Sequence, residues 1–132
     1  METAQIAGRA LGLAPGARDG LEEQHRDGVP LMDDASFHRA VERALREPDR
    51  LSLGEETASQ AEARFASALE ALLEDGGSSR PAVVSHGTVV SLYAARVAGV
   101  DALELWRRLG MPACVTLTYP GPELGEVIEE VR

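Results

Sequence analysis

The chain has little of several residue types that would point to specialised folds or partners. Of its 132 residues only Cys114 is a cysteine, and lysine and asparagine do not occur. A single cysteine excludes an internal disulfide and a thiolate metal cluster. We expect Cys114, in its apolar stretch, to be a small buried side chain. No run approaches the roughly 18 apolar residues of a membrane span, and no charged and then apolar leader opens the sequence. We therefore expect a cytoplasmic protein without metal, other cofactor or membrane partner.

Basic residues are also outnumbered and scattered. The 13 basic residues face 22 acidic ones, which gives a net charge of −9. A protein that binds nucleic acid needs a basic face to displace counterions from phosphates, so we expect no nucleic-acid partner. A local pocket can oppose the sign of the whole chain, so a small anionic substrate is not excluded.

The chain does have an alternation of helix and strand patterns. Its length suggests one domain over residues 1–132, which can bury roughly two thirds of the surface of the unfolded chain. Apolar periodicity predicts helices over 2–12, 35–46, a segment ending near 74, 88–99 and 101–109, and strands over 81–85, 113–119 and 126–132. Of these strands, the first is expected to be buried and the last to lie at an edge. Strands that alternate with helices predict an α/β protein with a mostly parallel sheet.

Capping residues indicate where these helices begin. Asp33 or Asp34 can cap the helix over 35–46. Ser52 with Glu55 fits a capping box for the helix that ends near residue 74, and Asp101 with Glu104 forms a second box.

The stretch PAVVSHGTVVSLYAARVAGV (81–100) places His86 between a predicted strand and a predicted helix. Gly87 lets the backbone approach a ligand, and a helix start offers free N–H groups and partial positive charge. A histidine there can donate to a phosphate oxygen or move a proton near neutral pH. A structural histidine packed in a loop is the alternative. Ligands of such sheets collect beyond the carboxyl ends of the strands, but the S-H-G tripeptide alone does not decide for the functional role.

Four segments, in order, resemble motifs of the histidine phosphatase superfamily, the phosphoglycerate-mutase-like proteins. ETAQIAGRALGL resembles the helix after its S-P-L-x-R-A-x-x-T-A motif, and LEEQHRDG resembles its acid-bearing L-x-E segment. LSLGEETASQAEARFASALEAL resembles its G-E-S/T segment and long helix, and VVSHGTVVSLYAARVAG resembles its second histidine motif. The resemblance implies a three-layer αβα fold with a mostly parallel sheet. It also implies action on phosphate monoesters through a phosphorylated histidine.

The resemblance assigns roles to individual residues. The second histidine, which holds phosphoryl oxygens, becomes His86, with Gly87 and Thr88 as further phosphate-binding residues. The acid that protonates the leaving oxygen becomes Glu23, with the adjacent Glu22 as the alternative. The expected catalytic residues are thus His86 and Glu23, and the expected partner is a small phosphorylated substrate or phosphate.

The chain departs from the family pattern at its beginning. No R-H-G occurs in it, so the family's nucleophilic histidine, a neighbouring arginine and the first strand are missing. Because Met1 stands inside the R-A-x-x-T-A register, we expect an N-terminally truncated domain that is inactive by itself. A rearranged sheet, strand exchange in a homodimer or a partner chain should compensate for the missing strand. The alternatives are a non-catalytic phosphate-binding or interaction module of the same fold and an unrelated α/β protein.

The remaining candidates have weaker chemistry. His25 could line the same mouth as Glu23, but a surface loop is its expected place, and His38 is expected to face solvent. The three histidines match no zinc motif such as H-E-x-x-H. No G-x-S-x-G elbow makes Ser85 a hydrolase nucleophile.

Overall fold

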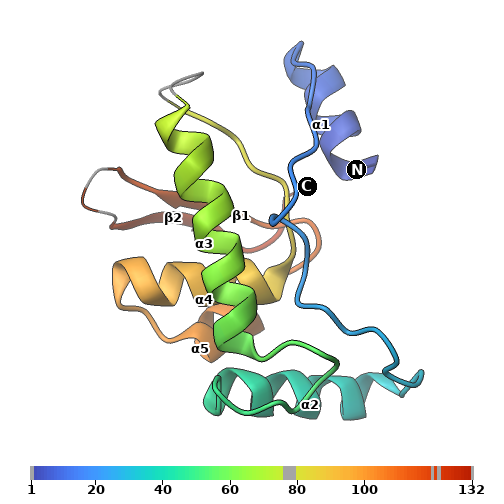
Figure 1. Cartoon of the computed structure of the whole chain (residues 1–132). Coiled ribbons are helices and arrows are strands. Elements are labelled where there is room, and N and C mark those ends of the chain that lie inside the picture. Colours follow the sequence, from blue (N-terminus) through green and yellow to red (C-terminus); the bar gives the residue numbers. More distant parts are fainter. Residues whose placement is uncertain (1, 76–79, 120, 122, 132) are drawn as a thin grey trace.

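A computed structural model describes residues 2–75, 80–119, 121 and 123–131. These residues form five helices and a two-stranded sheet (Figure 1). The elements are α1 (Glu2–Leu11), α2 (Asp34–Arg46), α3 (Ala58–Glu74), α4 (Gly87–Ala98), α5 (Ala102–Arg108), β1 (Cys114–Leu117) and β2 (Leu124–Ile128). Each of the five helices predicted from the sequence is confirmed. No helix among the described residues is both long and apolar enough to cross a membrane.

Local capping explains where the helices begin and end. The Asp33 carboxylate accepts a hydrogen bond from the backbone N–H of Ser36 at the start of α2, and Asp101 does the same for Glu104 at α5. The predicted box of Ser52 and Glu55 is wrong, because α3 begins later. There Thr57 and Gln60 each bond to the other's backbone, which satisfies two otherwise free N–H groups.

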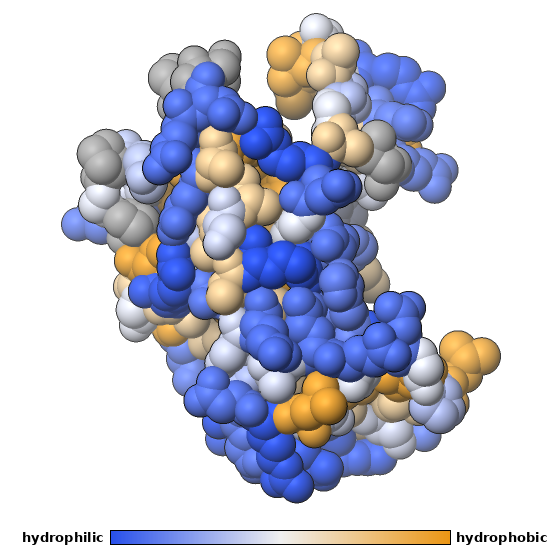
Figure 2. All heavy atoms as spheres, viewed as in Figure 1, coloured by the Kyte–Doolittle hydropathy of each residue, from blue (hydrophilic) through white to orange (hydrophobic). Residues whose placement is uncertain are grey.

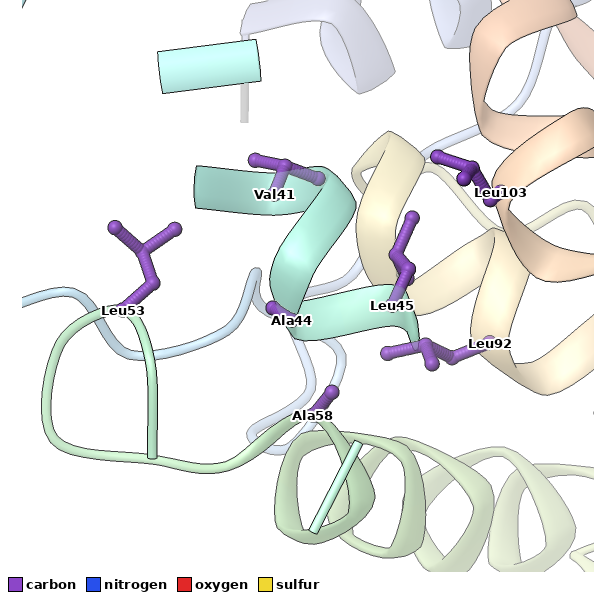
Figure 3. Close-up of a cluster of buried hydrophobic side chains, with 7 residues drawn as sticks. All are labelled: Val41, Ala44, Leu45, Leu53, Ala58, Leu92 and Leu103. Atoms are coloured by element: carbon purple, nitrogen blue, oxygen red, sulfur yellow. The ribbon is translucent and has the colours of Figure 1, made fainter. Parts of the chain in front are cut away.

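The core lies where α2, α3, α4 and α5 pack together. One cluster joins helices α2 to α5 and the loop before α3, through Val41, Ala44, Leu45, Leu53, Ala58, Leu92 and Leu103 (Figure 3). A second cluster lies between α3 and α4, where the rings of Phe65 and Tyr93 meet edge to face with centroids 5.7 Å apart. Helix α4 contributes to both clusters and has buried side chains on most of its faces.

The sheet of the described residues differs from the prediction. Strands β1 and β2 pair in antiparallel fashion, with Val115 opposite Val127, and no third strand joins them in the described part of the chain. Along β1 the half-buried Val115 and Leu117 alternate with the exposed Thr116, whereas Tyr119, beyond the strand, is exposed. Cys114 is exposed rather than buried, because the apolar neighbours of β1 lie on its other face.

The segment 81–85, called the connecting segment below, was expected to be a buried strand and is not one. It runs as irregular chain from α3 toward α4 (Figure 1). Val84 is 45% exposed. Residues 82–84 make no backbone–backbone hydrogen bond with any described residue. The expectation fails because a strand exists only when a neighbour supplies a ladder, and none of the described residues does.

Helix α1 stands apart from the core (Figure 1). Gly8 is the only buried residue of this helix, and its apolar residues Ile6 and Leu11 are exposed. Figure 2 shows apolar side chains at the end of α1 and in the turn that follows, where Leu11 and Leu13 lie. The core described above therefore does not cover the apolar side of α1.

Candidate functional site

His86 is the residue that precedes the first turn of α4. It adopts extended backbone angles (φ −119°, ψ 154°), its ring is exposed, and its side chain makes no capping hydrogen bond. The backbone N–H groups of Gly87, Thr88 and Val89 have no backbone acceptor among the described residues. An exposed imidazole and several free donors therefore lie at the positive end of a helix dipole.

A loop from the N-terminal part of the chain meets this helix start. Residues 20–26, called the acid loop below, carry both candidate acids. Ser85 donates a hydrogen bond of 2.6 Å from its hydroxyl to the carbonyl of Leu21. Arg26 donates from Nη2 to the hydroxyl of Thr88 at 2.9 Å. Two contacts between residues more than 60 positions apart thus place the acid loop beside the start of α4 (Figure 1).

One arginine of α3 holds the acid loop in shape. The guanidinium of Arg64 donates to the carbonyl oxygens of Gly20, Glu22 and Glu23 at 2.9, 3.2 and 3.1 Å. The same group binds both carboxylate oxygens of Glu56 at 2.9 Å. Hydrogen bonds with Glu56 raise the pKa of Arg64 despite its burial. Arg64 therefore fixes the backbone of the acid loop with a planar, bidentate donor set.

Glu56 completes this support from the loop before α3. Its Oε2 also accepts the backbone N–H of His25 at 3.0 Å. The hydrogen bond with Arg64, although opposed by burial, holds the pKa of the Glu56 carboxyl below its usual range. Gln24 is 3% exposed and donates to the carbonyl of Glu56 at 2.7 Å, which anchors the middle of the loop inside the protein.

The two candidate acids lie in different surroundings. The Glu22 carboxylate lies 3.1 Å from Nη1 of Arg64 and 3.3 Å from Nε2 of His25. Burial raises the pKa of Glu22, but backbone hydrogen bonds and the Arg64 charge outweigh it and lower the pKa. Glu23 is half-buried, and its Oε2 lies 3.7 Å from Nη2 of Arg26, the nitrogen that donates to Thr88. Glu23 is therefore the acid that is linked to the start of α4.

Aromatic side chains of α2 and α5 support the start of α4 from behind. A Cβ atom built on Gly87 would lie 3.5 Å from the Trp106 ring, so the helix start rests against the indole. Phe37 lies beneath the Arg26 guanidinium, which is 5.1 Å from the ring centroid. His38 is exposed, as expected, but its ring also meets Trp106 edge to face at 5.3 Å.

Sequence reasoning missed the two arginines of this region. Arg26 lies in the quoted acid segment, three positions after Glu23, and Arg64 lies on α3 one position before Phe65. The signal that could have found Arg64 is a cation on the helix face next to an apolar stripe, opposite an acidic loop. His25 is exposed in the acid loop, as expected. The described residues hold no group of three or more metal-ligating side chains.

Comparison with known proteins agrees with the resemblance seen in the motifs. Searches of curated proteins and of solved structures gave no significant match. The family model of the histidine phosphatase superfamily, branch 1, matches residues 1–128, which is nearly the whole chain. The chain therefore belongs to the histidine phosphatase superfamily (branch 1).

Proposed function

We propose that this chain carries the second histidine and the acid of a site that binds phosphate monoesters. The observation that supports this most is a chain of contacts beside His86, in which the Glu23 carboxylate pairs with Arg26 at 3.7 Å and Arg26 donates a hydrogen bond to Thr88. It brings an acid, a cation and a helix start together from segments far apart in the sequence. Such a set suits a tetrahedral dianion, which needs donors for its oxygens and a proton for the leaving group.

The roles in this proposal follow from the chemistry of each group. The His86 imidazole and the first N–H groups of α4, from Gly87 and Thr88, donate to phosphoryl oxygens. Glu23 protonates the leaving oxygen. We favour it over Glu22, whose carboxylate already binds Arg64 and His25. The resemblance assigns the attack on phosphorus to a histidine of an R-H-G motif, and this sequence has none. We therefore propose that the chain alone does not turn over phosphate esters.

The finer architecture is also a proposal. We infer that the connecting segment becomes a strand of a parallel sheet when a neighbouring strand is present, within the three-layer αβα arrangement. Two observations on the described residues support this inference: the backbone of residues 82–84 pairs with none of them, and one side-chain hydrogen bond, from Ser85, anchors the segment. The neighbour could come from more of the same protein, from strand exchange in a homodimer or from a partner chain. Light scattering after size-exclusion chromatography distinguishes a monomer from a homodimer.

A non-catalytic phosphate-binding module is the second candidate. The observation in its favour is that the sequence contains no R-H-G, so a phosphate site built from these residues has no nucleophilic histidine. In-frame sequence upstream of Met1 separates the two candidates. An R-H-G there supports the enzyme, and a stop codon without one favours the module.

Thermal unfolding in sodium phosphate, compared with sodium chloride at equal ionic strength, tests the binding site. We expect phosphate to raise Tm in the wild type, because a ligand that binds only the folded state stabilises it. The rise should disappear in His86→Ala and persist in Arg46→Gln, which removes an exposed cation of α2. An aryl phosphate should show no turnover. Robust turnover that His86→Ala abolishes would contradict the proposed inactivity, and equal Tm in both salts would contradict phosphate binding.

A further inference from the structure

Arg26 and Arg64 are equally accessible but very unequally paired. Each side chain is 20% exposed. The Arg64 guanidinium uses Nε, Nη1 and Nη2, and binds three carbonyls and the Glu56 carboxylate. The Arg26 guanidinium makes one hydrogen bond, to Thr88. A guanidinium has five N–H donors, so most donors of Arg26 have no acceptor in the described part of the chain.

The surroundings of Arg26 make its lack of hydrogen-bond acceptors energetically unfavourable. Its Nε is fully buried and has no hydrogen-bond partner among the described residues. Its closest carboxylate oxygen, on Glu23, lies at 3.7 Å, beyond hydrogen-bond distance. Phe37 covers one face of the group. Burial lowers the pKa of Arg26, and the Glu23 charge only partly offsets this. A half-buried cation with unused donors is stabilised by an anion that reaches it.

We propose that Arg26 is a phosphate-binding residue of the site, which donates from its unused N–H groups to oxygens of the phosphate held at the start of α4. This inference rests on the proposed function. The hydrogen bond to Thr88 keeps the planar guanidinium next to the first turn of α4, where His86 and the free N–H groups lie. A planar fork of donors matches two phosphate oxygens at once, which an ammonium group cannot do.

Titration of the whole chain with inorganic phosphate at constant ionic strength, followed by NMR, tests this role. We expect Arg26→Gln to weaken phosphate binding about tenfold or more, because a hydrogen-bonded charge is lost. Arg26→Lys keeps the charge but not the fork, so we expect a loss of only about threefold. Arg39→Gln is the matched control, since Arg39 is exposed on α2 and donates a hydrogen bond to Ser36 of the same helix. It should leave the affinity unchanged.

The outcomes separate this inference from the proposed function. If Arg26→Gln binds phosphate like the wild type while His86→Ala does not, the role of Arg26 is overturned and the proposed function stands. If the wild type itself does not bind phosphate, both are overturned. If Arg26→Gln does not fold, the NMR signals of the Arg26 guanidinium in the wild type test the inference instead. A phosphate-dependent shift of the Arg26 signals supports the inference, and unchanged Arg26 signals beside shifted Gly87 and Thr88 amides overturn it.

Discussion

The acid loop and the connecting segment meet at the start of α4, and they differ in how the fold holds them. The acid loop is held by hydrogen bonds from Arg64 to three of its carbonyls, and by Glu56 and the buried Gln24. Among the described residues, the connecting segment has one such anchor, from Ser85 to Leu21. The difference teaches that contacts with α3 and the loop before it position the acid loop, while His86 depends on α4 for its position.

The largest loss of folding stability is expected from a substitution at Gly54, whose backbone lies against the acid loop. Gly54 has a φ of +77°, and a Cβ there would lie 2.3 Å from the carbonyl oxygen of His25. Gly54→Ala should therefore lower the free energy of unfolding by about 3 kcal/mol or more, through strain and displacement of the loop. Gly28→Ala is the control, with φ +74° and open space around it. It should cost only about 1 kcal/mol. Equal losses in urea unfolding would show that Gly54 does not support the loop.

Arg64→Met should have the next largest effect. It keeps part of the side chain's packing but removes the donors that hold the acid loop, and it leaves Glu56 without its main partner. We expect a loss of about 3 kcal/mol in urea unfolding. The exposed Arg46, which pairs with Glu42 on the same helix, is the control. Arg46→Met should lower the free energy of unfolding by less than about 0.5 kcal/mol. A similar loss in both variants would show that Arg64 is not the main support of the acid loop.

The same network predicts how stability depends on pH. Because the hydrogen bond with Arg64 lowers the pKa of Glu56, the folded state favours the deprotonated carboxylate more than the unfolded state does. The stabilisation is therefore fully present above the ordinary glutamate pKa of about 4.3 and is lost as the pH falls through the lower folded-state value. Glu56→Gln should flatten the decline in stability between about pH 5 and pH 3. An unchanged decline in urea unfolding at these pH values would contradict the assignment.

The smallest effect is expected at the connecting segment. Ser85→Ala removes the hydrogen bond to the carbonyl of Leu21. It should lower the free energy of unfolding by about 1 kcal/mol, because only one hydrogen bond is lost. Ser67→Ala, which removes an exposed hydroxyl bonded within α3, is the control and should be nearly neutral. A loss as large as that of Arg64→Met would mean that the two segments are held equally.

How far the sequence predicts this molecule depends on where the determining information lies. The helices follow from local periodicity and caps such as Asp33 and Asp101, so they are predicted well. The connecting segment was expected to be a strand because its residues suit one, yet a strand requires a partner that local composition cannot supply. The acid and the histidine could be proposed from motifs. The importance of Arg26 and Arg64 could not, because their contacts join residues more than 40 positions apart.

Hydrogen exchange of the wild type with and without inorganic phosphate tests the central claim most directly. The claim is that the acid loop and the start of α4 form one anion site. Without phosphate, the amides of residues 82–84 should exchange fast and those inside α4 slowly. With phosphate, we predict slower exchange at residues 23–26 and at 87–89 together, while 82–84 remain fast. Protection of only one of these two stretches, or of neither, would contradict a shared site.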